Sequence, residues 1–250
     1  GRSLALECAA RGMNVLLVAL EENLLADLAE NIRRDHGVDA DYLCVDLTDE
    51  QAARSVYDWC VSKGYQVNML LSNAGIGMSG LYEKNPLDKY RRLILLNCMA
   101  AAELTHHFLP MLKEQGEAWV LYTGSLESTI AVPYKAAYTA SKHFLYGFSL
   151  ALGEELREFG IQVSILCPGP VTSNEGSLMR MKSEGKLAQL LAFSPEEVAP
   201  IAINGLLNRR RIIVPGALPS FIEVLALHLP RRLKMKILHR VFLKFRDIQG

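Results

Sequence analysis

The sequence lacks several features that would indicate other classes of protein. No apolar run reaches the roughly 18–20 residues that a membrane-spanning helix needs. Lysine plus arginine and aspartate plus glutamate each number 27, so the chain as a whole has no net attraction for nucleic acid. Internal repeats and low-complexity segments are also absent. With half of its 250 residues apolar, the chain is long and apolar enough to form one large core.

The sequence also lacks any cysteine or histidine pattern that is typical of a metal site. Its five cysteines are odd in number and show no C-x-x-C spacing, and each lies in an apolar run. We therefore expect reduced thiols in a cytoplasmic protein and no bound metal. The adjacent pair His106–His107 has no carboxylate or cysteine near it in a ligand pattern, so a position on a helix surface is its simpler interpretation.

Short apolar runs alternate with helical patterns along most of the chain. The predicted strands are 14–20, 41–47, 67–75, 118–125, 162–169 and 211–216. The predicted helices are 1–12, 22–34, 49–63, 86–114, 134–158 and 194–207. This alternation predicts an α/β fold, a doubly wound parallel sheet in a single domain over 1–216, followed by a helical extension over 217–250.

Small and polar residues follow four of the predicted strands, in the stretches "VDLTD", "SNAG", "TGS" and "CPGPVTS". In an open parallel sheet the ligand binds at the carboxyl ends of the strands. One such stretch is only a turn, but four at successive strand ends predict a common ligand.

One set of polar residues has a distinctive spacing. Tyr138 and Lys142 lie one helical turn apart, Ser125 precedes Tyr138 by thirteen residues, and Asn97 lies twenty-eight residues before Ser125. With "SNAG" and the Pro-Gly pair after Cys167, this order resembles the short-chain dehydrogenase/reductase family, whose fold is Rossmann-like. The resemblance extends from Gly1 to Gly216.

The resemblance implies a chemical role for each residue of the set. Hydride transfer to a carbonyl leaves negative charge on its oxygen, which needs a proton, and Tyr138 is expected to supply it. Lys142 is expected to lower the pKa of Tyr138 and to hold the nicotinamide ribose, while Ser125 bonds the carbonyl oxygen. Asn97 is expected to distort its helix and to order a water molecule that connects the lysine to solvent. Ser128 is either a second hydroxyl in the site or a turn residue.

The resemblance also implies an NAD(P)(H) cofactor and a set of contacts to it. Gly1 matches the last glycine of the phosphate-binding loop. The other expected contacts are Asp46 and Leu47 at the adenine, Asn73, Ala74 and Gly75 at the adenosine ribose, and Pro168, Gly169, Val171 and Ser173 at the nicotinamide.

The implied activity is interconversion of a secondary alcohol and a ketone on an apolar substrate, acyl, steroid-like or lipid-like. The family often forms dimers or tetramers through the helices expected at 86–114 and 134–158. Two alternatives remain open: a cofactor-binding sensor or membrane-associated scaffold without turnover, and an isomerase or dehydratase on the same fold.

The sequence departs from the family at its beginning and after the first predicted strand. The family's opening strand and most of its glycine-rich loop are missing, so we expect roughly 15–20 further residues upstream in the natural protein. Ala19 and Leu20 replace the acidic or basic residue that selects NAD or NADP. The missing acid slightly favours NADP(H), although Glu21 and Glu22 favour NAD if they turn inward.

The segment 231–246 carries seven Lys/Arg and no acid, which leaves the rest of the chain at −7 (20 basic minus 27 acidic residues). Its apolar residues recur every four positions, at Leu233, Ile237, Val241 and Phe245, and Leu238 and Phe242 widen this stripe. Such a helix suits peripheral contact with a membrane, or it packs on the domain with its charges in solvent. The Leu- and Met-rich segment 174–193 is either a substrate lid, as the resemblance implies, or a surface helix.

Overall fold

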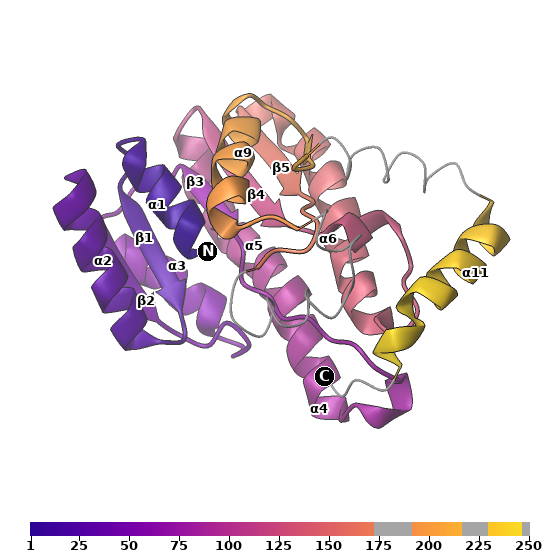
Figure 1. Cartoon of the computed structure of the whole chain (residues 1–250). Coiled ribbons are helices and arrows are strands. Elements are labelled where there is room, and N and C mark those ends of the chain that lie inside the picture. The colour runs from indigo at the N-terminus through magenta and orange to yellow at the C-terminus, as the bar shows by residue number, and fades with distance from the viewer. Residues whose placement is uncertain (173–191, 217–229, 247–250) are drawn as a thin grey trace.

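The computed structural model describes residues 1–172, 192–216 and 230–246 (Figure 1). The helices are α1 (Arg2–Ala10), α2 (Glu22–His36), α3 (Ala52–Ser62), α4 (Leu87–Ile94), α5 (Ala100–Glu114), α6 (Ala136–Glu155), α9 (Pro195–Leu207) and α11 (Arg231–Phe242). The strands are β1 (Val15–Ala19), β2 (Ala40–Cys44), β3 (Met69–Ser72), β4 (Ala118–Thr123), β5 (Ile161–Leu166) and β6 (Ile212–Ile213). All strand pairings within these ranges are parallel, which confirms the predicted α/β class.

Local sequence signals explain where several elements begin and end. α2 ends at Gly37, whose φ of 66° is a left-handed conformation that glycine adopts without strain. α9 begins after Ser194, whose hydroxyl accepts a hydrogen bond from the Glu197 N–H while the Glu197 side chain accepts from the Ser194 N–H. This capping box satisfies two backbone donors that the first turn of a helix leaves free.

Helices cover both faces of the strands, as expected for a doubly wound fold (Figure 1). On one face, α1, α2 and α9 pack in a core that includes Ile32, Ala202 and Leu206. On the other, α3, α5 and α6 pack in a second core that includes Phe108 and Leu112. Within the described ranges, no helix combines the length and the apolar character needed to cross a bilayer.

Within the part of the chain that the structure describes, the strands form two sheets rather than one continuous sheet. β1 pairs with β2, and the second sheet has the order β3-β4-β5-β6. Gly1 lies at the carboxyl end of β3, where a Cβ added to it would meet the Asn73 side-chain nitrogen at 3.0 Å. The expectation that further residues precede Gly1 stays a prediction, as does the boundary at 216.

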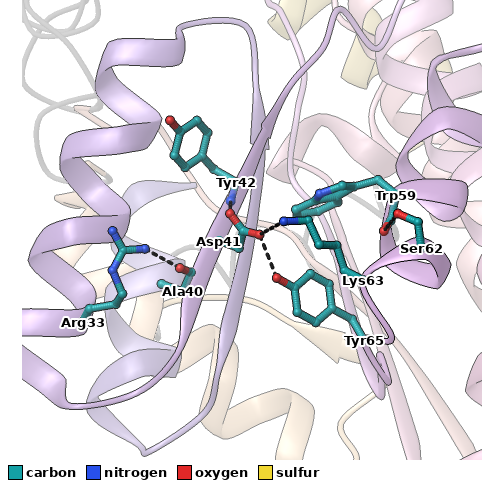
Figure 2. A network of polar contacts seen from close by, with 8 residues as sticks. All are labelled: Arg33, Ala40, Asp41, Tyr42, Trp59, Ser62, Lys63 and Tyr65. Atoms are coloured by element: carbon teal, nitrogen blue, oxygen red, sulfur yellow. Dashed lines mark hydrogen bonds and ion pairs between the residues drawn. The ribbon is translucent and has the colours of Figure 1, made fainter.

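A polar network connects the β1–β2 sheet with the end of α3 (Figure 2). The Asp41 carboxylate accepts hydrogen bonds from the Tyr65 hydroxyl at 2.7 Å and the Tyr42 N–H at 2.8 Å, and Lys63 Nζ lies 3.6 Å away. The hydrogen bond from Tyr65 is the main reason that the pKa of Asp41 is lowered, and it raises the pKa of Tyr65 to about 12. This network holds the sheet at the amino ends of its strands.

The register of the second sheet brings three strand ends to one edge. Ser72 of β3 lies opposite Tyr122 of β4, and Thr123 of β4 lies opposite Leu166 of β5. The residues that follow these strands, beginning at Asn73, Gly124 and Cys167, therefore meet at the edge where the sequence predicts a ligand site.

Candidate active site

Helix α6 places Tyr138 and Lys142 on the face that points toward the end of β4. Lys142 is 5% exposed, and its Nζ donates a hydrogen bond to the Thr123 carbonyl at 2.7 Å. The same Nζ lies 5.8 Å from the centre of the Tyr138 ring. The two residues are therefore neighbours, as their spacing predicts, but the ammonium is anchored by a strand-end carbonyl.

Ser125 follows β4 and caps a short 3₁₀ turn, Leu126–Thr129. Its hydroxyl accepts a hydrogen bond from the Glu127 N–H at 3.1 Å and also bonds the Tyr138 phenol. The Ser128 hydroxyl accepts from the Ser125 N–H at 2.9 Å and is almost fully buried. This geometry favours the interpretation of Ser128 as a turn residue that fixes Ser125.

The pKa of Tyr138 differs from the sequence-based expectation. It is raised to about 12, first by burial and then by the negative charge of Glu127, while the hydrogen bond with Ser125 lowers it. The expected lowering by Lys142 is therefore wrong for the protein alone. Burial of the phenol outweighs an ammonium whose hydrogen bond goes to Thr123.

Burial also changes the pKa of Lys142. It falls to about 8, because the apolar surroundings disfavour the ammonium, although Cys98 and Cys167 act in the opposite direction. Residues with strongly shifted pKa values at a strand-end edge are typical of functional sites.

Asn97 lies in a π-helical turn, Leu95–Met99, between α4 and α5. Its side-chain amide accepts a hydrogen bond from the Ile76 N–H at 2.9 Å and donates to the Ile76 carbonyl and the Ser141 hydroxyl, each at 3.0 Å. Such turns occur often at functional sites, and the structure agrees with the expected helix distortion. The water relay stays a prediction.

The strand-end loop after β3 leaves its backbone open beside these residues. Ala74 and Gly75 are exposed, and Asn73 accepts a hydrogen bond from the Thr123 hydroxyl at 3.2 Å. A Cβ added to Gly75 would lie 3.1 Å from Asn97 Oδ1 and 3.6 Å from Lys142 Nζ. A ligand is therefore able to approach the backbone here, next to the lysine.

Asp46 has a local role in the structure. Its carboxylate accepts hydrogen bonds from the Thr48 N–H at 2.9 Å and hydroxyl at 2.7 Å, and it pairs with Arg92 at 3.0 Å. The bonds from Thr48 are the main cause of its lowered pKa. The adenine contact expected of Asp46 and its neighbour Leu47, which packs against the second core, stays a prediction.

The segment after β5 is joined to the Ser125 turn. The Leu126 N–H donates to the Pro168 carbonyl at 2.9 Å, and Val171 forms a parallel bridge with Phe193. Gly169 lies half-buried between them. Ser173 and nearly all of the predicted lid, 174–193, fall outside the described residues.

Two charged residues beside the site were not predicted from the sequence. Lys135 Nζ bonds Glu127 Oε1 at 2.8 Å, and both side chains are 18% exposed. Among the described residues, buried Glu127 Oε2 has no hydrogen-bond partner. An acid two residues after Ser125 and a base three residues before Tyr138 were the available signals.

A small pocket lies on the open side of Tyr138. Its lining comes from the loop after β3, from the turn Tyr82–Lys84 and from the start of α6. Met78, Leu81 and Tyr82 make much of this wall apolar, and Lys135 brings a charge to its rim.

The model of the family "short chain dehydrogenase" matches residues 1–183 of this chain. A very-long-chain 3-oxoacyl-CoA reductase from Aspergillus clavatus is 28% identical over 212 residues, which cover 82% of this chain and 59% of the relative. Human dehydrogenase/reductase SDR family member 7 is 36% identical over 133 residues, 53% of this chain and 39% of the relative. The chain thus spans about half the length of these relatives.

Solved structures are similar along most of the chain. A 7β-hydroxysteroid dehydrogenase has a TM-score of 0.85 and 21% identity, covering 95% of this chain and 92% of that one. A short-chain dehydrogenase from Sphingobium yanoikuyae, solved with NADPH, has a TM-score of 0.76 and 24% identity, covering 92% of each chain. At such identities the likeness establishes a shared fold.

Proposed function

The chain belongs to the short-chain dehydrogenase family, and from this premise we propose that it is an NAD(P)(H)-dependent oxidoreductase that interconverts a secondary alcohol and a ketone on an apolar substrate. The observation that carries the proposal is the convergence of Ser125, Tyr138 and Lys142 at one strand-end edge. A binding protein without turnover has no need for a buried lysine beside a half-buried phenol that lines a pocket.

The residues at this edge fit a dinucleotide. Gly75 has no side chain where a Cβ would fill the space next to Asn97 and Lys142, so a sugar is able to approach Lys142 there. When bound, the nicotinamide exchanges a hydride with the substrate carbon. Lys142 would bond the nicotinamide ribose, and Asn73 and Ala74 would line the adenosine side.

The chain's own residues handle the proton at the substrate oxygen. The Ser125 hydroxyl, already bonded to the Tyr138 phenol, holds a carbonyl oxygen in the same position. In the reduction direction Tyr138 donates its proton to that oxygen, and in the oxidation direction the phenolate accepts it. A pKa of about 12 means that the phenol carries the proton that it would donate, whereas acceptance needs positive charge near the phenol, which Lys142 and an oxidised nicotinamide would supply.

NADP(H) is the favoured cofactor within this proposal. Ala19 and Leu20 are both exposed at the carboxyl end of β1, so no acid at these two positions repels an adenosine phosphate. The Sphingobium yanoikuyae structure with NADPH supports the same preference. The ratio of the dissociation constants for NADPH and NADH measures it, and tighter binding of NADH would refute it.

An apolar substrate, acyl, steroid-like or lipid-like, suits both the pocket and the named relatives. Met78, Leu81 and Tyr82 line the pocket. The relatives include very-long-chain 3-oxoacyl-CoA reductases, and a similar structure is a 7β-hydroxysteroid dehydrogenase. These names support the substrate class and leave the particular substrate open.

A ketone panel with NADPH tests the proposal. The wild type is expected to oxidise NADPH with at least one apolar ketone, and Tyr138→Phe to lose turnover by about 10²–10⁴-fold while still binding NADPH. Tyr82→Phe is the matched control, because Tyr82 lines the same pocket and has no role in proton transfer. NADPH binding without turnover in the wild type would indicate a sensor or scaffold, and substrate conversion without NADPH oxidation an isomerase or dehydratase.

We further propose a homodimer or homotetramer in the cytoplasm, with peripheral contact to a membrane. Large apolar side chains are exposed on the two helices expected to associate, Ile94, Leu95 and Met99 near α4 and Phe144 on α6, each at 41%. Light scattering in solution measures the assembly, and a monomer at micromolar concentration would contradict it.

A further inference from the structure

Helix α11 and the short 3₁₀ turn that follows it, Leu243–Phe245, are attached to the rim of the pocket beside Tyr138. The Leu81 N–H donates to the Arg246 carbonyl at 3.3 Å, and the Tyr134 and His239 rings lie 5.7 Å apart. Lys135 Nζ lies over the rings of Phe242 and Phe245, at 5.3 and 4.8 Å. Leu81, Tyr134 and Lys135 all line the pocket beside Tyr138, so the position of α11 is tied to the pocket entrance.

The apolar residues of this helix do not form the single stripe that the sequence predicts. Phe245 is 2% exposed, and Met235, Leu238 and Phe242 are half-buried on the side that faces the domain. Leu233, Ile237 and Val241 are 45–49% exposed and follow one another at intervals of four residues along the outer side. We name these three residues the outer ridge.

A row of cations runs beside the outer ridge. Arg232, Lys236 and Arg240 are exposed, and each precedes a ridge residue by one position, which places the two rows about 100° apart around the helix. No acid occurs between 230 and 246. An aliphatic ridge next to a row of cations matches the boundary between the acyl region and anionic head groups of a bilayer.

A second copy of the chain fits this surface less well. Two copies of α11 packed ridge to ridge would bring their rows of cations together, whereas helix pairs of that kind need opposite charges beside the apolar seam. Three aliphatic side chains also form a narrow strip compared with the roughly 800 Å² that each partner buries in a stable protein interface.

We propose that α11 lies in the surface of an anionic membrane through its outer ridge and thereby holds the pocket entrance at the lipid, from which an apolar carbonyl or alcohol substrate enters directly. The statement about the substrate rests on the proposed function. Membrane binding by the ridge does not, because it follows from the exposed side chains and charges of α11 alone.

Vesicle sedimentation of the full chain tests the membrane contact. The wild type is expected to sediment with vesicles of equimolar phosphatidylcholine and phosphatidylglycerol and to stay in solution with phosphatidylcholine alone. The triple variant Leu233→Ser/Ile237→Ser/Val241→Ser and the double variant Lys236→Glu/Arg240→Glu should each lower the partition coefficient at least about tenfold. A control variant, Leu24→Ser/Val61→Ser, removes comparably exposed apolar residues from α2 and α3 and should bind as the wild type does.

Two results would overturn the membrane contact. The first is that the wild type does not bind the anionic vesicles, or that the ridge variant binds them as tightly as the wild type does. The other is a ridge variant that changes the mass measured by light scattering while the wild type shows no vesicle binding, since a second copy would then cover the ridge.

A second measurement separates this inference from the proposed function. Turnover is compared for a water-soluble ketone and for a long-chain ketone dissolved in the vesicles. The ridge variant should keep its rate with the soluble ketone and lose about tenfold with the vesicle-borne one. Equal rates of both proteins with the vesicle-borne ketone would overturn direct entry from the lipid. No turnover of any ketone would refute the proposed function and leave sedimentation to decide on the ridge.

Discussion

Two tyrosine–lysine clusters lie at opposite ends of the strands, and they differ in what surrounds the lysine. At the amino ends, Lys63 is 54% exposed and Tyr65 donates its hydroxyl proton to the Asp41 carboxylate (Figure 2). At the carboxyl ends, Lys142 is 5% exposed, and its Nζ bonds a neutral carbonyl. The same two residue types therefore form a solvated structural contact in one place, and a buried lysine beside a half-buried phenol in the other.

Both tyrosines have a pKa of about 12, but the causes differ. The Asp41 carboxylate raises the pKa of Tyr65 by accepting its proton in a hydrogen bond. Burial and the charge of Glu127 raise that of Tyr138. A phenol bonded to a carboxylate has no free place for a substrate, whereas the Tyr138 hydroxyl shares its bond with a serine. A tyrosine beside a lysine thus indicates a catalytic role only where the tyrosine hydroxyl does not donate a hydrogen bond to a carboxylate of the protein.

The largest difference between the clusters should appear when each lysine is replaced by methionine. Lys142→Met is expected to lower turnover at least about a hundredfold, because the charge next to the phenol and the ribose contact are both lost. Lys63→Met should leave turnover unchanged. Steady-state rates with NADPH and a ketone measure both, and equal losses in the two variants would remove the functional distinction.

Lys142→Met should also differ from the wild type in how stability depends on pH. The pKa of Lys142 is about 8 in the folded protein, below its unfolded value, so the folded state releases the proton first as pH rises. The cost of burying the ammonium is therefore complete below about pH 8 and is relieved toward about pH 10.

From pH 7 to about 9.5 the wild type should gain about 2 kcal/mol relative to Lys142→Met. Urea unfolding at the two pH values measures this. A constant difference between wild type and Lys142→Met would show that the buried lysine does not titrate in this range.

The fold and the meeting of Tyr138 with Lys142 were predictable because their signals are local, whereas Asn97 and Ser125 were expected only from the resemblance to the family. The apolar run "VLLVA" and the spacing of Tyr138 and Lys142 are properties of short stretches, and β1 and α6 follow from them. The two clusters are different. Asp41 and Tyr65 are twenty-four residues apart, and only the tertiary structure brings the turn after α3 to β2.

Two expectations were wrong: the single apolar stripe in 231–246 and the lowered pKa of Tyr138. Neither the spacing of apolar residues nor a nearby charge in the sequence shows which side chains the tertiary structure buries. The four-residue repeat in 231–246 places Leu233 and Phe245 in one stripe, yet the first is 48% exposed and the second 2%. The Tyr138 pKa was expected to fall because Lys142 is near it in sequence, while desolvation of the phenol is the larger effect. Both depend on which face the tertiary structure covers.

An intermediate effect is expected at the amino-end cluster. Tyr65→Phe should destabilise the fold by about 1 kcal/mol, because Asp41 loses its strongest hydrogen bond, and should leave turnover unchanged. The lowered pKa of Asp41 adds stability above the ordinary carboxyl pKa, so the difference should fade as the solution is acidified through the folded pKa.

Tyr42→Phe is the matched control, since Tyr42 bonds Asp41 through its backbone N–H only (Figure 2). Urea unfolding near neutral and acidic pH compares the three proteins. A loss of turnover in Tyr65→Phe with unchanged stability would mean that the two clusters are not separate.

The smallest effect on activity is expected from replacing Glu127. Like Asp41 in the amino-end cluster, Glu127 is a carboxylate that raises the pKa of the neighbouring tyrosine. Lys135 at 2.8 Å partly neutralises its charge. Glu127→Gln removes negative charge beside the phenol and so favours the phenolate. The rise of alcohol oxidation with pH should then move to lower pH by less than about one unit.

Lys135→Met exposes the full charge of Glu127 and should move the same profile to higher pH. If the pH profiles of alcohol oxidation shift in the same direction in both variants, the cause is a structural change in the turn. An electrostatic effect requires shifts in opposite directions.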